Sequence, residues 1–262
     1  MPPAALRSAF ACLLAAALVA TALADHSAPA GIPPDDALLL ITDGNRRFVA
    51  DEALHFQQDT LRRSETANNG QKPYAVILTC SDSRVPPELI FDQGIGCLFV
   101  IRVAGNVAQN DEVASVEYGV GHLGARLIVV LGHTKCGAVT AVVDDAITGP
   151  NLEKLVKPIV PAVARARSDN PALQGSPLVE AAIRANVAQA IADLLRLSPS
   201  LAIGVTRGQL RVVGALYDIE TGEVQFFDSN GPVPSAPVES QGSAPAPAER
   251  PRSTRSAVEP DN

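Results

Sequence analysis

Two cysteines and one histidine have the residue types and the spacing of a metal site. His133 and Cys136 stand three residues apart in Gly-His-Thr-Lys-Cys-Gly, at an expected turn from strand to helix, so both can face one ion. Cys80, after another expected strand, completes three soft or borderline ligands. Three protein ligands leave the fourth tetrahedral position of zinc open, as a catalytic site requires. On residue types alone, the alternative is two buried thiols and a hydrogen-bonded core histidine.

The residues that follow Cys80 add a charged pair to this candidate site. In Cys-Ser-Asp-Ser-Arg-Val-Pro, Asp82 and Arg84 stand two residues apart and can form a bidentate ion pair. A carboxylate beside zinc competes for the open position. An arginine that holds the carboxylate would keep it off the metal and orient it toward a bound water. The plainer alternative is a surface ion pair, which contributes little to stability.

Short apolar runs and helical patterns alternate along the chain and indicate the elements that position these residues. Residues 35–50 have helical spacing with acidic residues near their start, and they predict a surface helix. The runs rich in Val and Ile suit parallel strands covered by helices. The expected strands are 74–79, 98–103, 127–131 and 201–205, the expected covering helices are 111–123, 138–147, 152–167 and 178–197, and residues 209–217 and 223–227 predict an edge hairpin.

The predicted fold class is therefore α/β, with a mostly parallel central sheet flanked by helices and an antiparallel edge hairpin. In such sheets the active crevice lies beyond the carboxyl ends of the strands. Cys80 stands at the end of the expected strand 74–79, and His133 stands at the end of 127–131. The fold class and the candidate ligands thus point to the same edge of the sheet.

Both ends of the chain differ in composition from its centre. Residues 1–24 carry Arg7 as their one charged side chain, an uncharged run at 9–20 and small residues before Asp25, which predicts a signal peptide cleaved after Ala24. Residues 25–34 are interpreted as a linker and 35–229 as one catalytic domain. Residues 230–262 predict a disordered tail rich in Pro, Ser and Ala, with seven prolines. The expected location is periplasmic or secreted, with no membrane contact once the signal is removed.

Charge and cysteine content exclude some classes of function. The formal net charge of −7 and the pI of about 5.1 argue against a nucleic-acid partner, which requires clustered Lys and Arg. Once Cys12 leaves with the signal, three cysteines remain, and a simple disulfide framework needs an even number. Metal coordination would protect such thiols in an oxidising compartment.

The motifs at these positions resemble those of the beta-class carbonic anhydrases. Cys-Ser-Asp-Ser-Arg-Val at 80–85 and Gly-His-Thr-Lys-Cys-Gly at 132–137 are similar to the two zinc motifs of that family, with 52 residues between Cys80 and His133. The resemblance extends over about residues 35–228. It implies the zinc-dependent, reversible hydration of carbon dioxide to bicarbonate and a proton, by attack of zinc-bound hydroxide in an open site. It also implies one Zn²⁺ per chain and a homodimer or homotetramer.

The resemblance assigns roles to single residues as well. It implies that Cys80, His133 and Cys136 are the zinc ligands, and that Asp82 and Arg84 keep the fourth position for water or hydroxide. The implied substrate-binding residues are Gln71, which would donate to a bicarbonate oxygen, Phe99 and Tyr118, which would keep the pocket apolar, and Gly137, whose backbone N–H would lie near the metal.

Two positions depart from the pattern of the family. Val103 follows Arg102 where many relatives carry Asn, and this departure leaves the role of Arg102 open. Ile77 stands where the bicarbonate-inhibited members carry Trp. The second departure suggests an open, constitutively active site rather than one closed by Asp82.

Three other functions fit parts of the same pattern. A relative that hydrates carbon disulfide or carbonyl sulfide would share every ligand. An inactive zinc-binding protein would be expected to have lost Asp82 or Arg84, and both are present. A redox protein would pair Cys97 with a ligand thiol and would hold no stoichiometric zinc, whereas the plainer interpretation of Cys97 is a core thiol.

Overall fold

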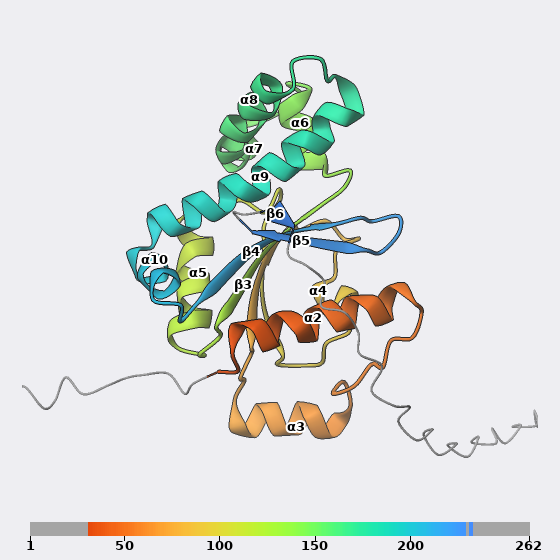
Figure 1. Ribbon diagram of the computed structural model, residues 1–262, viewed down its shortest axis with the longest axis vertical. Coiled ribbons are helices and arrows are strands. Elements are labelled where there is room, and N and C mark those ends of the chain that lie inside the picture. Colours follow the sequence, from red (N-terminus) through yellow and green to blue (C-terminus); the bar gives the residue numbers. More distant parts are fainter. Residues whose placement is uncertain (1–30, 229–230, 233–262) are drawn as a thin grey trace, which may run out of the picture.

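A computed structural model describes residues 31–228 and 231–232, and a six-stranded sheet lies at their centre (Figure 1). Its order is β2-β1-β3-β4-β5-β6; the first four strands run parallel, and β5 and β6 run antiparallel to their neighbours. The α/β class and the antiparallel edge hairpin are thus confirmed. The strands are β1 Ala75–Thr79, β2 Leu98–Arg102, β3 Leu127–His133, β4 Arg211–Tyr217, β5 Val224–Asp228 and β6 Gly231–Pro232.

Helices cover both faces of the sheet. The helices α2 and α4 lie on one face, and α5, α9 and α10 lie on the other (Figure 1). The helices are α2 Pro34–Val49, α3 Thr60–Asn69, α4 Pro87–Ile90, α5 Asn110–Gly121, α6 Gly137–Val143, α7 Pro150–Val156, the 3-10 turn η1 Lys157–Ile159, α8 Val160–Asp169, α9 Gly175–Leu197 and α10 Pro199–Thr206.

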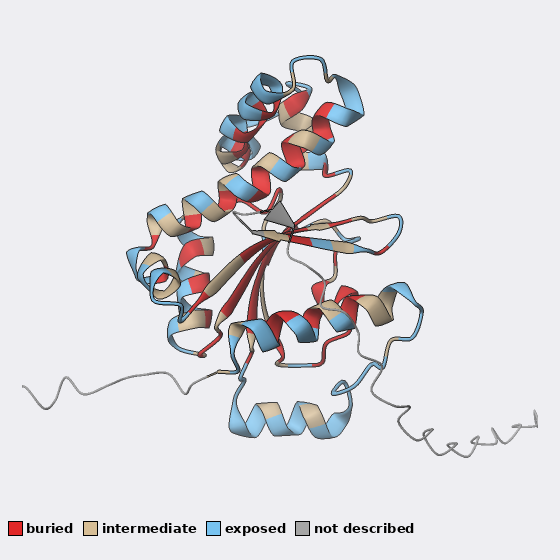
Figure 2. Ribbon diagram, in the orientation of Figure 1, coloured by how far each residue is buried: buried red, intermediate tan, exposed pale blue. Residues whose placement is uncertain are grey.

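Alternate side chains of the central strands supply two separate cores. Ile77 of β1 packs in one cluster with Ile41 of α2, whereas Val76 and Leu78 pack in the other cluster with helices such as α9. Every residue of β1 and of β3 is buried, as the red central strands of Figure 2 show. Burial on both faces explains why these segments are continuous apolar runs rather than alternating patterns.

A third apolar cluster lies beyond the carboxyl end of the sheet. It joins residues of α6, η1 and α8 to the first half of α9, and it includes Cys80 and Cys136. The helix α9 spans two clusters, since Ile183 belongs to this one and Leu194 to the core on the sheet. The thiols of the two candidate ligands, Cys80 and Cys136, therefore lie against packed apolar side chains.

One expected strand is wrong: residues 201–205 lie in α10. Pro199 stands in the first turn of this helix, and the Ser198 hydroxyl accepts a hydrogen bond from Leu201 N–H, which caps the helix start. Only Leu201 of the helix is buried, and Ile203 is half exposed. The fourth parallel strand is β4 instead, the first strand of the predicted hairpin.

The expected helix at 152–167 is also interrupted. It divides into α7, η1 and α8, with Pro158 in the 3-10 turn and Pro161 in the first turn of α8. Proline lacks the N–H that a continuous helix needs and clashes with the preceding turn. The sequence did not predict α3 or α4.

The predicted signal peptide at 1–24, most of the predicted linker and nearly all of the predicted tail at 230–262 lie outside the described residues. Within residues 31–228 and 231–232, no helix is long and apolar enough to cross a membrane.

Candidate active site

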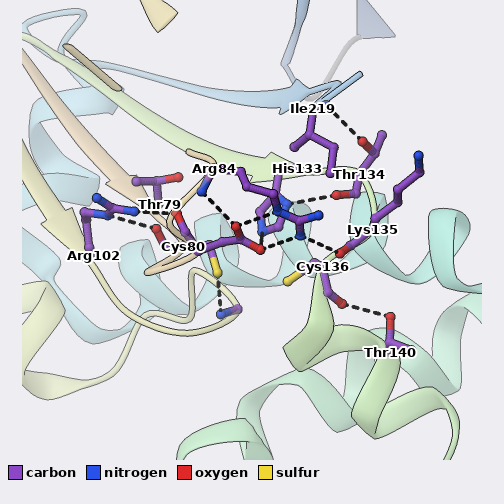
Figure 3. Close-up of polar contacts among 12 residues, drawn as sticks. Thr79, Cys80, Arg84, Arg102, His133, Thr134, Lys135, Cys136, Thr140 and Ile219 are labelled. Atoms are coloured by element: carbon purple, nitrogen blue, oxygen red, sulfur yellow. Dashed lines mark hydrogen bonds and ion pairs between the residues drawn. The ribbon is translucent and has the colours of Figure 1, made fainter. Parts of the chain in front are cut away.

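The candidate metal ligands meet where β1 and β3 end side by side. Thr79 of β1 pairs with Leu131 of β3, so Cys80 leaves the sheet next to the end of β3. His133 is the last residue of β3, and Cys136 immediately precedes α6. The ligand atoms of the three residues lie within 4.8 Å of one another, and all three residues are buried (Figure 3). The structure thus brings together the set predicted from the sequence.

The hydrogen bonding of His133 suits a metal ligand. Its Nδ1 lies 2.9 Å from the carbonyl oxygen of Thr134, and a carbonyl only accepts, so Nδ1 carries the proton. The lone pair of Nε2 is then free, and this buried atom has no hydrogen-bond partner among the described residues. A buried acceptor without a partner is unfavourable. An imidazole nitrogen oriented in this way beside two thiols fits Zn²⁺.

The two thiols change each other's ionisation. A hydrogen bond with Cys136 lowers the pKa of Cys80 to about 4, and the same bond raises the pKa of Cys136 above its ordinary value. The N–H of Gly105, whose nitrogen lies 3.3 Å from Cys80 Sγ, also lowers the pKa of Cys80. The thiolate is the form of cysteine that binds a metal, so Cys80 is prepared for that role.

Asp82 and Arg84 form the predicted bidentate pair beside the ligands. Arg84 Nε lies 2.9 Å from one carboxylate oxygen of Asp82, and Arg84 Nη2 lies 2.7 Å from the other. The side-chain hydrogen bonds from Arg84 hold the pKa of Asp82 well below its usual range. The nearer oxygen of Asp82 lies 3.9 Å from His133 Nε2. The carboxylate therefore lies next to the ligand set while both its oxygens bind the guanidinium.

Arg102, whose role the sequence left open, binds the backbone of the same loop. Its Nε donates to the carbonyl of Cys80 at 3.1 Å, and its Nη2 donates to the carbonyl of Asp82 at 2.6 Å (Figure 3). Arg102 thus fixes the segment that carries one ligand and the carboxylate. Sequence reasoning missed this role because a backbone carbonyl can belong to any residue and leaves no pattern.

The loop that carries His133 and Cys136 is braced by the hairpin of β4 and β5. Thr134 N–H donates to the carbonyl of Tyr217 at 2.9 Å, and the Thr134 hydroxyl accepts from Ile219 N–H at 3.1 Å. Arg84 Nη2 also lies 3.4 Å from the carbonyl of Lys135, which links this loop to the loop of Asp82 (Figure 3). The two loops are therefore held as one unit.

Three of the expected substrate residues lie away from the ligands of their own chain. Phe99 pairs with Val76 near the start of β1, about 13 Å along the strand from Cys80. The ring of Tyr118 lies 5.9 Å from the ring of Phe99, and Gln71 is an exposed residue ahead of β1. These residues are grouped at the amino end of the sheet, whereas the ligands lie at the carboxyl end.

The remaining expected substrate residue, Gly137, does lie beside the ligands. It follows Cys136 as the first residue of α6, and a Cβ atom added there would meet nothing within 4 Å. The space next to this backbone is therefore open.

Cys97 lies too far from the ligand thiols to form a disulfide with them. It precedes β2 next to Tyr74, whose N–H donates to the Cys97 carbonyl, so about 20 Å of strand separates it from Cys80. A disulfide requires Cα atoms within about 7 Å. Cys97 is buried and its thiol donates to Gln57 Oε1, as suits a core thiol.

Zinc content tests this assignment of the ligands. The purified protein should hold about one zinc per chain, and Cys80→Ser and Cys136→Ser should lose most of it because zinc binds thiolates far better than hydroxyls. Cys97→Ser is the matched control, since it removes a buried thiol outside the cluster, and it should keep its zinc. Atomic emission on the folded proteins measures the ratio. Equal losses in all three variants would contradict the assignment.

Comparison with known proteins identifies the family. A family model described as carbonic anhydrase matches residues 75–224. Carbonic anhydrase 2 of Mycobacterium tuberculosis is 37% identical over 202 residues, covering 76% of this chain and 95% of the relative. A carbonic anhydrase of Pseudomonas aeruginosa is 37% identical over 202 residues, covering 70% of this chain and 87% of the relative.

A solved structure extends this similarity to the fold. The beta-carbonic anhydrase CcaA superposes with a TM-score of 0.59 and 30% identity, covering 74% of this chain and 90% of that one. The region that the family model matches contains the ligand cluster and the four parallel strands of the sheet. The chain belongs to the carbonic anhydrase family, in its beta class.

Proposed function

We propose that the chain catalyses the reversible hydration of carbon dioxide to bicarbonate and a proton at one zinc site, with Asp82 and Arg84 serving its open position. The observation that carries this proposal is the buried Nε2 of His133. Among the described residues this atom has no hydrogen-bond partner, and it lies within 4.8 Å of two thiols and 3.9 Å from the carboxylate that Arg84 holds. Three protein ligands leave a position for water, as catalytic zinc sites do.

The chemistry of zinc, Asp82 and Arg84 assigns a different role to each. Zinc bound by these residues would supply a Lewis acid that lowers the pKa of a water molecule. Because Arg84 holds the pKa of Asp82 low, the carboxylate remains ionised and is a weak base. Asp82 would therefore accept a hydrogen bond from the water and orient it, and the proton would pass to solvent. The arginine would prevent the carboxylate from occupying the position that the water needs.

The cleft would be completed by a neighbouring subunit of a homodimer or homotetramer. Gln71, Phe99 and Tyr118 lie about one strand length from the ligands of their own chain, so they can line a cleft only if another chain supplies them. In the described sheet β2 is an edge strand, and Tyr118 beside it is 48% exposed. Two beta-carbonic anhydrases of Sordaria macrospora with this fold are tetrameric. An exposed edge with aromatic residues suits pairing with a second copy.

Substitution of Asp82 tests the proposed role of the dyad. Asp82→Asn keeps the shape of the side chain but removes its charge and presents an amide to Arg84, so the rate of hydration should fall by about 100-fold or more. Zinc content should stay near one per chain, because Asp82 is not a ligand. Stopped-flow measurement of proton release from carbon dioxide gives the rate.

The matched control for this substitution is Asp59→Asn. Asp59 is a carboxylate that accepts a backbone N–H at the start of α3, and Asn caps a helix about as well. The control should hydrate carbon dioxide at the wild-type rate. A wild-type rate in Asp82→Asn with full zinc would exclude the proposed role of Asp82.

Mixed oligomers test whether the cleft is shared between subunits. Asp82→Asn and Gln71→Ala should each be nearly inactive alone. If each site takes Asp82 from one chain and Gln71 from the other, a dimer with one chain of each variant has one site that carries both substitutions and one site that carries neither. Unfolding and refolding a 1:1 mixture should therefore restore about a quarter of the wild-type activity, given random pairing in a two-fold dimer. No recovery, with mixed dimers demonstrated by mass spectrometry, would mean that each chain uses its own Gln71.

We also propose that the chain is exported to the periplasm or secreted, which rests on the sequence of residues 1–24. Expression of the full chain in a bacterial host should give a periplasmic or medium fraction whose first residue, by N-terminal sequencing, is Asp25. An intact Met1 on protein in the cytoplasm would contradict export.

A further inference from the structure

A buried amide on α9 contacts a turn next to the metal ligands. Asn186 is 2% exposed, and its Nδ2 donates to the carbonyl of Gly105 at 2.7 Å. The two residues are 81 positions apart in the chain. Burying an amide is unfavourable unless it is hydrogen-bonded, so this short contact fixes the position of the turn relative to α9.

The turn itself has little freedom to move. Asn106 N–H donates to the carbonyl of Val103 at 3.0 Å, which closes a four-residue turn. Gly105 has a φ of +76°, and a Cβ atom there would lie 2.6 Å from Cδ1 of Ile159. Both the backbone conformation and the lack of space thus require glycine at this position.

The turn directs one backbone N–H at a ligand sulfur. The nitrogen of Gly105 lies 3.3 Å from Cys80 Sγ, and its N–H donates to that sulfur. A hydrogen bond of this kind holds the sulfur in place and reduces the electron density that it gives to a metal. Gly105 therefore links the two contacts: its carbonyl accepts from Asn186, and its N–H donates to the sulfur of Cys80.

We propose that Asn186 is a positioning residue of the metal site, which acts through the Gly105 turn to hold the Cys80 sulfur in the geometry that zinc requires. The inference rests on the proposed zinc site. Without the Asn186 amide, the buried Gly105 carbonyl has lost its donor, and the turn relaxes toward water or another partner. The Gly105 N–H then leaves the sulfur, and one of the three ligands loses its support.

The test compares the zinc affinity of the wild type with that of Asn186→Leu, which keeps a side chain branched at Cγ and has no donor, although it is larger. Competition with a chelator should show zinc binding weakened by about 10- to 100-fold, the usual effect of removing an outer partner of a ligand. Cobalt(II) in place of zinc provides a second measurement, because its sulfur-to-metal absorption band reports the hydrogen bonding of the thiolates. The band should shift in the variant.

Ser198→Ala is the matched control, at the residue that follows the last residue of α9. Ser198 is also buried and caps α10, about 18 Å along the helix axis from Asn186. It should lose stability while keeping the zinc affinity and the cobalt spectrum of the wild type. If Asn186→Leu does not fold, Asn186→Ala, which cannot clash, is measured in the same way.

The outcomes separate this inference from the proposed function. A wild-type protein without stoichiometric zinc would overturn the zinc site itself. A zinc-loaded wild type whose affinity and cobalt band are unchanged in the folded Asn186 variant would overturn the positioning role alone. Weaker binding in both Asn186→Leu and Ser198→Ala, with unshifted bands, would also overturn it, because it would trace the effect to stability.

Discussion

The alignment of two parallel strands, β1 and β3, determines where everything else in the site lies. Because Thr79 pairs with Leu131, Cys80 and His133 reach the same edge of the sheet from segments that are far apart in the chain. A slip of one residue would turn each side chain to the opposite face. Apolar side chains on both faces of β1 prevent that slip, because it would exchange the contents of two packed cores. Hydrophobic packing thus sets the position of the ligands.

Cys80 and Cys136 lie just outside the regular elements and His133 is the last residue of β3, so other contacts must hold the loops that join them. Arg102 binds two carbonyls of the Cys80 loop, and Thr134 ties the second loop to the β4–β5 hairpin. Both loops also meet at Arg84. The bonds from Arg102, from Arg84 to Lys135 and from Ile219 to Thr134 each satisfy a backbone group outside the sheet ladder, as such groups require where they are poorly solvated. The same bonds reduce the freedom of the loops, so the donor atoms stay close together.

The sequence predicted the parts of this arrangement that depend on local spacing. It failed at one ambiguous apolar run and where contacts between distant segments decide the position. The ligands and the dyad could be predicted because their chemistry resides in side chains with fixed local spacing. The strand expected at 201–205 was wrong because a short apolar run has no period of its own, and the Ser198 cap favours a helix. The contacts of Arg102 could not be predicted, since they end on backbone carbonyls. The positions of Gln71 and Tyr118 relative to the ligands could not be predicted either, because they depend on how distant segments pack in the fold.

The length of β1 gives a physical reason why activity would depend on the formation of a dimer in this protein. Metal ligands lie at the carboxyl end of the strand, and the expected substrate residues lie at its amino end, so a rigid strand keeps them apart within one chain. No movement of a loop can bridge such a distance without breaking the sheet. A two-fold axis beside β2 can bring the carboxyl end of one sheet next to the amino end of the other. It does so at two places, because a two-fold interface repeats each contact. In the proposed dimer, each cleft then requires both chains, and the apolar lining of the pocket forms only on association.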